Sequence, residues 1–342
     1  MRALTFVGPD RFEVGTRPTP EAGPDESLIA PRFVGICATD LELLEGSHPY
    51  FERGVAAFPL QPGHEWSGVV LDSPDPRFPR GARVVADPEV SCGRPDCVLC
   101  PVGHVPWCPN RREIGCRGGL AGAAAEVIAI PTRNLHLIPD GVSDRDAVLA
   151  EPAVTVLGGL SRVRDVRGAR VLVIGAGTIG LIAAQVLVAE GATVDLAVRS
   201  TVREHALPGV DTILVQDPEH DPIPETYPIV FCAAGSTDAF KLGLRALGNG
   251  GELALLGVPG GRVDQVDVAS VLHKDATIHG VLNYSVGGPA QFDRALDALA
   301  RGVVAGSTLI DRAFPLAEAS AAFDRVRDAT RPRPKVLLEI AG

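Results

Sequence analysis

The sequence predicts an α/β protein in which a β-rich domain is joined to a doubly wound parallel sheet. Up to about residue 150, short β-type runs alternate with Pro and Gly clusters without long helical periodicity, which favours a compact, partly open barrel. From about residue 154, apolar runs alternate with helical segments, as in a parallel sheet with crossover helices. A glycine-rich turn at residues 175–180 joins an apolar run to a helical segment and predicts a strand–turn–helix unit there.

The individual elements follow from these patterns. The β-type runs of the first part occupy residues 28–30, 68–71, 83–86 and 125–130. In the second part we expect strands at residues 171–174, 193–198, 212–215, 229–232, 251–257 and 278–283, and helices at residues 154–163, 181–189, 239–246 and 290–301. A last β-type run at 335–340 is expected to return to the first domain. The predicted domains are residues 1–153, residues 154–284, and residues 285–342 as that return.

The turn reads Gly-Ala-Gly-Thr-Ile-Gly between a predicted strand and a predicted helix. In this context Gly175 permits the tight turn, Gly177 lets the backbone approach a pyrophosphate, and Gly180 lets the helix pack close to the strand. The backbone N–H groups at the helix start, at Thr178 and Ile179, face the phosphate with the positive end of the helix dipole. The turn therefore predicts a dinucleotide site. The alternative is a glycine-rich turn without a ligand.

The end of the second predicted strand selects the cofactor. NAD enzymes usually place an acidic residue there to bind the ribose 2′-hydroxyl, but this position falls near Val198, and Asp195 lies earlier, in mid-strand. The residues that follow include Arg199, Ser200 and Arg203, whose guanidinium and hydroxyl groups suit a 2′-phosphate. We therefore expect NADP rather than NAD. The alternative is that both arginines are solvated charges at the start of the next helix.

Composition excludes several classes of partner. The chain has 342 residues, with 46% hydrophobic and 22% charged residues and a formal net charge of −10. This charge argues against nucleic acid or an anionic membrane as a main partner and leaves a small-molecule substrate. No apolar run reaches 18 residues and residues 1–6 lack the long apolar region of a signal peptide, so we expect a cytoplasmic protein.

Three short motifs carry zinc ligands. The first, Gly-Ile-Cys-Ala-Thr-Asp, supplies Cys37 and Thr39; the second, Pro-Gly-His-Glu-Trp-Ser-Gly, supplies His64 and Glu65. The third, Ala-Glu-Pro-Ala, supplies Glu151 where the two predicted domains meet. Cys, His and Glu all bind zinc, and a catalytic zinc keeps one position open for water or substrate. Ahead of a dinucleotide fold, the three motifs together predict a catalytic zinc site.

A second metal site is predicted from cysteine spacing. The chain has seven cysteines, an odd number that points to metal rather than disulfides in a cytoplasmic protein. Four thiolates in a loop rich in Gly and Pro are typical of a closed structural zinc site. These four have the spacing C-x4-C-x2-C-x7-C and are Cys92, Cys97, Cys100 and Cys108. The alternative is a lobe that no longer binds metal. We expect Cys116 to be a spare thiol and Cys232 to lie in the core.

These motifs, in order, resemble the zinc-containing medium-chain dehydrogenase/reductase family. The resemblance rests on GICATD, PGHEWSG, the four-cysteine lobe, AEPAV, VLVIGAGTIG, LLGV and PKVLLEI across nearly the whole chain. It implies a GroES-like catalytic domain interrupted by a Rossmann domain, with substrate and cofactor in the cleft between them, and a homodimer or homotetramer. The chain departs from the usual structural lobe by two inserted residues in the first gap.

Within the family the chain resembles the polyol, sorbitol and glucose dehydrogenase branch. Simple alcohol dehydrogenases usually have Cys where Glu151 stands, and many carry a proton-relay His where Glu42 stands. The resemblance implies that Cys37, His64, Glu65 and Glu151 form the zinc shell, without all four binding directly at once. It also implies that Thr39 holds the substrate hydroxyl and starts a proton relay towards Glu42. The cofactor contacts that it implies are Thr155, Gly257, Val258 and Asn283.

The expected activity is therefore hydride transfer between NADP(H) and a secondary alcohol or carbonyl of a sugar, polyol or cyclitol. The first alternative is a zinc dehydrogenase of an amino alcohol or a simple secondary alcohol, with NAD as its cofactor. The second is a cofactor-binding protein without turnover, against which the complete ligand set argues. A metal-free reductase of the same fold would lack the ligands Cys37 and His64. We expect His48 to be a solvated loop residue.

Overall fold

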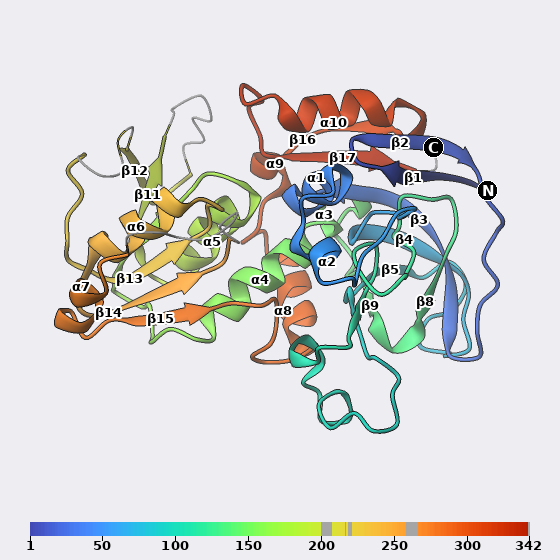
Figure 1. The fold of residues 1–342 in the computed structure, drawn as a ribbon, viewed down its shortest axis with the longest axis horizontal. Helices are drawn as coiled ribbons and strands as arrows, with labels where there is room; N and C mark the ends of the chain where they lie inside the picture. The colour runs from blue at the N-terminus through green and yellow to red at the C-terminus, as the bar shows by residue number, and fades with distance from the viewer. Residues whose placement is uncertain (200–206, 216, 218–220, 258–265, 341–342) are drawn as a thin grey trace.

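A computed structural model describes residues 1–199, 207–215, 217, 221–257 and 266–340. The chain forms a six-stranded sheet and a seven-stranded sheet, which stand side by side in Figure 1. Helices α4 and α8 lie between them in that view. In the described residues no helix is both long and apolar enough to cross a membrane. The expected cytoplasmic location stays a prediction.

The six-stranded sheet is entirely parallel, with strand order β12-β11-β10-β13-β14-β15. This is the order of the doubly wound dinucleotide-binding fold, so the predicted fold class is confirmed. Its strands are β10 (Arg170–Ile174), β11 (Thr193–Val198), β12 (Val210–Leu214), β13 (Tyr227–Cys232), β14 (Leu247–Leu255) and β15 (Thr277–Gly280).

Both faces of the parallel sheet are covered. Side chains alternate along a strand, so Val171 and Val173 enter one apolar core while Leu172 and Ile174 enter another. The first core contains the buried faces of α4 (Ala150–Leu160), α5 (Thr178–Ala189) and α8 (Ala290–Ala300). The second core contains the face of α6 (Thr237–Ala246). A near-continuous apolar strand such as β10 is what a sheet buried on both faces requires.

The other sheet has the order β16-β17-β3-β4-β5-β9, with β8 paired to β3. Its pairs are antiparallel except for β16 and β17. The last strand pairs with β3, with Val336 opposite Ile36, so the end of the chain joins the β-rich part. The strands are β3 (Glu26–Ile36), β4 (Glu65–Asp72), β5 (Arg83–Ala86), β8 (Ile128–Pro131), β9 (Leu135–Leu137), β16 (Ile310–Pro315) and β17 (Lys335–Glu339).

Short elements complete the described chain. Two further strand pairs form small sheets: β1 (Arg2–Gly8) with β2 (Arg11–Thr16), and β6 (Glu89–Val90) with β7 (Arg112–Glu113). The remaining α-helices are α1 (Ala38–Glu45), α2 (Pro49–Glu52), α3 (Asp144–Ala147), α7 (Val268–His273), α9 (Gly306–Leu309) and α10 (Ala319–Arg327). Single 3-10 turns occupy Cys100–Val102, Val105–Trp107, Thr132–Asn134 and Leu316–Glu318.

The structure differs from the sequence-based expectations at functional segments. Helix α1 was not expected; it begins after Cys37, whose N–H donates to the Asp40 carboxylate at 2.8 Å, and it ends at Gly46 with a φ of 75°. At eight residues it is too short to show a clear helical period. Helix α4 begins at Ala150 rather than 154, which places Glu151 in its first turn. Strand β15 ends at Gly280, before Asn283.

Candidate active site and metal centres

Three predicted ligands meet beside the antiparallel sheet. Cys37 caps α1, while His64 immediately precedes β4 and Glu65 is the first residue of that strand. Because β3 and β4 pair with Gly35 opposite Glu65, the end of β3 brings Cys37 to this strand. One ligand atom from each of Cys37, His64 and Glu65 lies within 4.8 Å of the others. A thiol, an imidazole and a carboxylate at this separation fit a catalytic zinc.

Glu65 is also held by a lysine from the other end of the chain. Nζ of Lys335, the first residue of β17, donates to Oε2 of Glu65 at 2.5 Å and to the Ile36 carbonyl at 3.4 Å. Both side chains are buried. Burial alone would lower the pKa of Lys335, but the Glu65 carboxylate outweighs it and the pKa of Lys335 is raised. The carboxylate therefore faces a positively charged ammonium group.

Gly35 leaves the space that Glu65 occupies. A Cβ atom at position 35 would lie 2.3 Å from Oε2 of Glu65 and 2.9 Å from Cγ1 of Val148. Both separations are far below van der Waals contact. The glycine of the first motif is therefore required by the carboxylate of the second.

His64 is oriented by two groups that contact Nδ1 of its ring. Its Nδ1 lies 3.4 Å from Oδ1 of Asp40 and 3.4 Å from Sγ of Cys116. Burial alone would lower the pKa of His64, but Cys116 and Asp40 outweigh it and the pKa is raised. Cys116, which was expected to be a spare thiol, is a free thiol outside both candidate ligand groups, and the turn after Gly115 folds it against His64. Cys232 is buried in the core, as predicted.

Glu151 lies near this group without joining it. Its carboxylate is outside the set of atoms within 4.8 Å of one another. Burial, together with the charge on Glu65, raises the pKa of Glu151 to about 7 against the opposing effects of His64 and Lys335. These interactions mark Glu151 as an electrostatic neighbour of the candidate zinc site.

Glu42, on α1, and His48, at the start of α2, lie close to each other. Glu42 is half-buried on α1, and burial, followed by the charge of Glu45, raises its pKa. Oε2 of Glu42 lies 3.8 Å from Nε2 of His48, and Nδ1 of His48 accepts the N–H of Tyr50 at 3.2 Å. With a side chain only 12% exposed, His48 is not the solvated loop residue expected from sequence, because it caps the short helix α2. Thr39 is half-buried in the first turn of α1.

Asn283 connects the two parts of the molecule. Thr155, on α4, donates to Oδ1 of Asn283 at 3.3 Å, and the Asn283 side-chain amide donates to Oε1 of Glu89 at 3.2 Å. The other carboxylate oxygen of Glu89 accepts from Nε of Arg111 at 2.6 Å. Asn283 has a φ of 40°, and its carbonyl oxygen would lie 2.1 Å from a Cβ at Gly158. Two predicted cofactor contacts, Thr155 and Asn283, are therefore in direct contact.

The four cysteines of the lobe converge. Their sulfur atoms lie within 4.8 Å of one another, with Cys97 and Cys108 at 3.7 Å and Cys100 and Cys92 at 3.8 Å. Backbone N–H groups of Cys100 and Leu99 lower the pKa of Cys97 to about 6, which favours the thiolate that binds metal. A set of four sulfurs fits a structural zinc.

The inserted residues of the lobe do not displace Cys92. Gly93 has a φ of 68°, a conformation that glycine adopts readily. The insertion also carries an exposed ion pair between Arg94 and Asp96, at 2.9 Å. The extra residues therefore loop outward, and the Cys92 sulfur stays with the other three.

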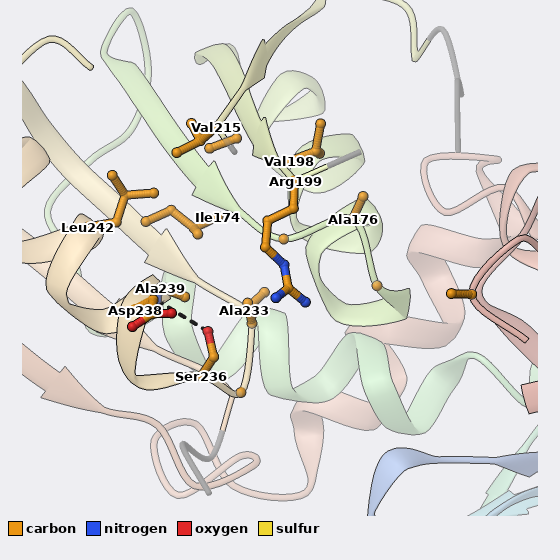
Figure 2. A pocket seen from close by; sticks show the side chains of 16 residues that line it. Ile174, Ala176, Val198, Arg199, Val215, Ala233, Ser236, Asp238, Ala239 and Leu242 are labelled. Atoms are coloured by element: carbon orange, nitrogen blue, oxygen red, sulfur yellow. Dashed lines mark hydrogen bonds between the residues drawn. The ribbon is translucent and has the colours of Figure 1, made fainter. Parts of the chain in front are cut away.

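The glycine turn lines a cavity of about 420 Å³, shown in Figure 2. Gly175 has a φ of 105°. A Cβ on Gly180 would lie 1.8 Å from the Gly175 carbonyl oxygen, whereas a Cβ on Gly177 would meet no atom within 4 Å. Gly180 therefore lets the helix approach the strand, and the space beside Gly177 stays open. Thr178 and Ile179 begin α5 at this point.

Arg199 extends into the same cavity from the end of β11 (Figure 2). Val198 precedes it, and no acidic residue stands at the strand end. Asp195 is turned away, since its carboxylate binds Arg170 at 2.6 Å and the Tyr227 hydroxyl at 2.5 Å. Gly257 lies against the Ala233–Gly235 backbone at the cavity wall. The other predicted cofactor contacts, Ser200, Arg203 and Val258, lie outside the described residues.

Similarity to known proteins identifies the family of this chain. Residues 23–140 match the alcohol dehydrogenase GroES-like domain. The chain is 32% identical to the L-threonine 3-dehydrogenase of Deinococcus radiodurans over 82% of each chain. The chain belongs to the zinc-type medium-chain dehydrogenase family.

Two further relatives of this dehydrogenase cover more of its length. It is 27% identical to the sorbitol dehydrogenase of Halalkalibacterium halodurans over 96% of each chain. A solved structure described as a zinc-binding dehydrogenase of Sinorhizobium meliloti, bound to NADP, is 28% identical and superposes with a TM-score of 0.86 over 99% of each chain. Both the predicted family and the predicted fold are thus confirmed.

The dehydrogenase also has site residues that sequence reasoning did not single out. Asp40 and Lys335 stand within two of the motifs that carried the resemblance, GICATD and PKVLLEI, so a signal for them existed. Cys116 and Glu89 had no such signal, because only the fold brings them to His64 and Asn283.

Proposed function

We propose that this dehydrogenase transfers a hydride between NADP(H) and a secondary alcohol or carbonyl of a polyhydroxylated substrate such as a sugar, polyol or cyclitol. The observation that carries the proposal is the convergence of Cys37, His64 and Glu65 within 4.8 Å, beside Glu151. Sulfur, nitrogen and oxygen ligands in one open site are the donors of a catalytic rather than a structural zinc.

The zinc would be held by Cys37, His64 and Glu65, with Glu151 close by, and it supplies a Lewis acid that lowers the pKa of a substrate hydroxyl. Thr39 follows Cys37 on α1 and would accept the substrate hydroxyl proton. Glu42, one helical turn further at i+3, would pass that proton towards solvent. Asp40 would hold the His64 ring in place, as the 3.4 Å separation between Oδ1 and Nδ1 supports.

The NADP would lie across the glycine turn and supply the hydride acceptor. The open space beside Gly177 suits the approach of a pyrophosphate, and Arg199 in the cavity at the end of β11 suits a 2′-phosphate. Thr155 and Asn283 would contact the nicotinamide, with Asn283 held by Glu89. The NADP bound to the Sinorhizobium meliloti relative supports this cofactor.

A polyhydroxylated substrate is supported by the polar groups around the candidate zinc site. Besides the proposed ligands, Glu42, Glu151 and Asn283 offer carboxylate and amide groups to several hydroxyls. The sorbitol dehydrogenase relative acts on such a compound by its name.

The proposed assembly is a homodimer or homotetramer. β15 is the edge strand of the parallel sheet, and Ile278 on it and Leu282 just beyond it are about two-fifths exposed, at 40% and 38%. An exposed edge strand with apolar side chains is a ready surface for pairing with a second copy. Size-exclusion chromatography with light scattering measures the assembly directly.

A second candidate function is the oxidation of an amino alcohol, favoured by the 32% identity to an L-threonine 3-dehydrogenase. Steady-state assays with NADP and NAD on polyols, cyclitols, amino alcohols and simple alcohols separate the candidates. The proposal expects the highest kcat/KM on a polyhydroxylated compound with NADP. Arg199→Asp should reduce kcat/KM for NADP at least tenfold without a comparable loss for NAD. Threonine as the best substrate would select the second candidate.

A further inference from the structure

A second cavity, of about 940 Å³, lies in the β-rich part of the molecule. Most of its wall comes from residues 54–61 and 109–121. Cys116 belongs to this wall, and its Sγ lies 3.4 Å from Nδ1 of His64. The cavity therefore borders the candidate zinc centre, although none of the proposed zinc ligands lines it. Its volume is within the usual range for small-molecule sites.

The lining of this cavity is strongly cationic. Four of its side chains are arginines and none is an aspartate or glutamate, in a chain whose net charge is −10. Two of the four charges are compensated by carboxylates that do not line the cavity. Arg17 pairs with Glu13, and Arg111 lies between Glu89, at 2.6 Å, and Glu113, at 2.8 Å.

The other two arginines, Arg112 and Arg117, have no carboxylate partner within 4.0 Å in the described part of the chain. The Nε atom of each is buried and makes no hydrogen bond. Arg117 is only 6% exposed; it donates to the Pro109 carbonyl at 2.8 Å and lies over the Tyr50 ring, 5.1 Å from its centroid. A buried charge is costly unless an opposite charge compensates it. Arg117 is therefore a buried charge without a carboxylate partner, and the half-buried Arg112 adds a second uncompensated charge to the same cavity wall.

We propose that the cavity binds a phosphate group between Arg112 and Arg117. A guanidinium group presents planar N–H donors that match the oxygens of phosphate, and Asn110 adds an amide to the same wall. A cation would be repelled, and an apolar ligand would leave both charges uncompensated. The cavity is much larger than a phosphate ion, so the group arrives either as inorganic phosphate or as one end of a larger molecule.

Calorimetric titration of the full chain with inorganic phosphate tests the site. The proposal expects saturable binding that weakens at least tenfold in Arg112→Gln and in Arg117→Gln. Arg112 is half-buried and its side chain makes no hydrogen bond or ion pair among the described residues, so its variant should fold even if the Arg117 variant does not. Near-ultraviolet circular dichroism checks the fold of each.

A matched control excludes a general effect of removing an arginine. Arg77→Gln removes an exposed guanidinium outside the cavity. This variant should bind inorganic phosphate like the wild type. Absence of saturable binding, or equal affinity in the wild type and a folded Arg112→Gln variant, would overturn the proposal.

A second experiment distinguishes the two sources of phosphate, and unlike the titration it rests on the proposed function. It compares KM for sorbitol and for sorbitol 6-phosphate in the wild type and in Arg112→Gln. A lower KM for the phosphorylated compound, lost in the variant, assigns the site to a substrate phosphate. Equal KM values together with a positive titration assign it to free phosphate. If no polyhydroxylated compound of the substrate panel is oxidised, the proposed function fails, while the titration still decides the phosphate site.

Discussion

Lys335 and Glu65 form a buried ion pair, with Nζ of the lysine 2.5 Å from Oε2 of the glutamate. The two residues stand at the starts of β17 and β4, 270 positions apart in the sequence. Their contact fastens the C-terminal strand to the candidate zinc centre. A negative charge from Glu65 is thereby balanced inside the protein whether or not its carboxylate also binds metal.

Replacing the lysine should destabilise the fold strongly. In Lys335→Met the Glu65 carboxylate keeps its burial and loses its charged partner, which typically costs about 3–5 kcal/mol. Urea unfolding of metal-free protein measures the free energy of unfolding without the effect of zinc binding. The double variant Lys335→Met, Glu65→Gln is the control, since it removes both charges and should recover part of the loss. A single variant as stable as the wild type would contradict this assignment.

Two glycines of the dinucleotide turn should behave differently when changed to alanine. In Gly180→Ala the new Cβ would lie 1.8 Å from the Gly175 carbonyl oxygen, so the free energy of unfolding should fall by about 1–3 kcal/mol or more. In Gly177→Ala the Cβ meets no atom within 4 Å, so stability should change by less than about 1 kcal/mol. The same Cβ would face the pyrophosphate, so the Kd for NADP should rise at least tenfold. Unchanged NADP affinity in Gly177→Ala would place the pyrophosphate elsewhere.

Cys92 should bind the structural zinc despite the inserted spacing. Its sulfur lies 3.8 Å from that of Cys100, within the four-sulfur group. Elemental analysis of Cys92→Ser should show one zinc fewer per chain than the wild type, because three remaining thiolates hold the metal less tightly. Cys232→Ala, which changes a core thiol of the parallel sheet, should keep the full zinc content. Equal zinc content in Cys92→Ser and the wild type would show that Cys92 is not a ligand.

Stability should depend on pH through Asp87. Burial raises the pKa of Asp87 to about 7, against the opposing hydrogen bonds from the Tyr284 hydroxyl and the Glu89 N–H. Between about pH 4 and pH 7 the folded protein therefore holds a proton that the unfolded chain has released. The free energy of unfolding consequently falls as pH rises through this window, by at most about 1.4 kcal/mol per pH unit.

The variant Asp87→Asn removes this titration. Its stability relative to the wild type should improve as pH rises from 5 to 7, by on the order of 2 kcal/mol. Urea unfolding at several pH values measures the difference. A difference that stays constant over this range would contradict the raised pKa.

The parallel sheet could be predicted in detail because its signals are local. Apolar runs such as residues 171–174 lie in strands buried on both faces, and the glycine turn marks where strand gives way to helix. Element ends were less predictable. Helix α4 begins four residues early at Ala150, since neighbouring segments rather than helical period determine where it starts.

The candidate ligands could be predicted from motifs, but their surroundings could not. Cys37, His64 and Glu65 stand in recognisable short segments and lie together in the structure, whereas Glu151 stays outside their group. Lys335, Cys116 and Glu89 become neighbours of the site through contacts between residues 52 to 270 positions apart. Lys335 stands in a recognisable motif, but no local pattern encodes which residue it pairs with, and none marks Cys116 or Glu89, because these contacts depend on how β17 and the turn after Gly115 fold back onto the site.

The most direct test of the account is NADPH formation from polyols by zinc-loaded protein, with His64→Gln as the matched variant. We predict reduction of NADP with a polyhydroxylated substrate, a rate in proportion to bound catalytic zinc, and a loss of at least a hundredfold in kcat in the variant. Turnover that persists in His64→Gln or without zinc, or turnover of simple alcohols with NAD alone, would contradict it.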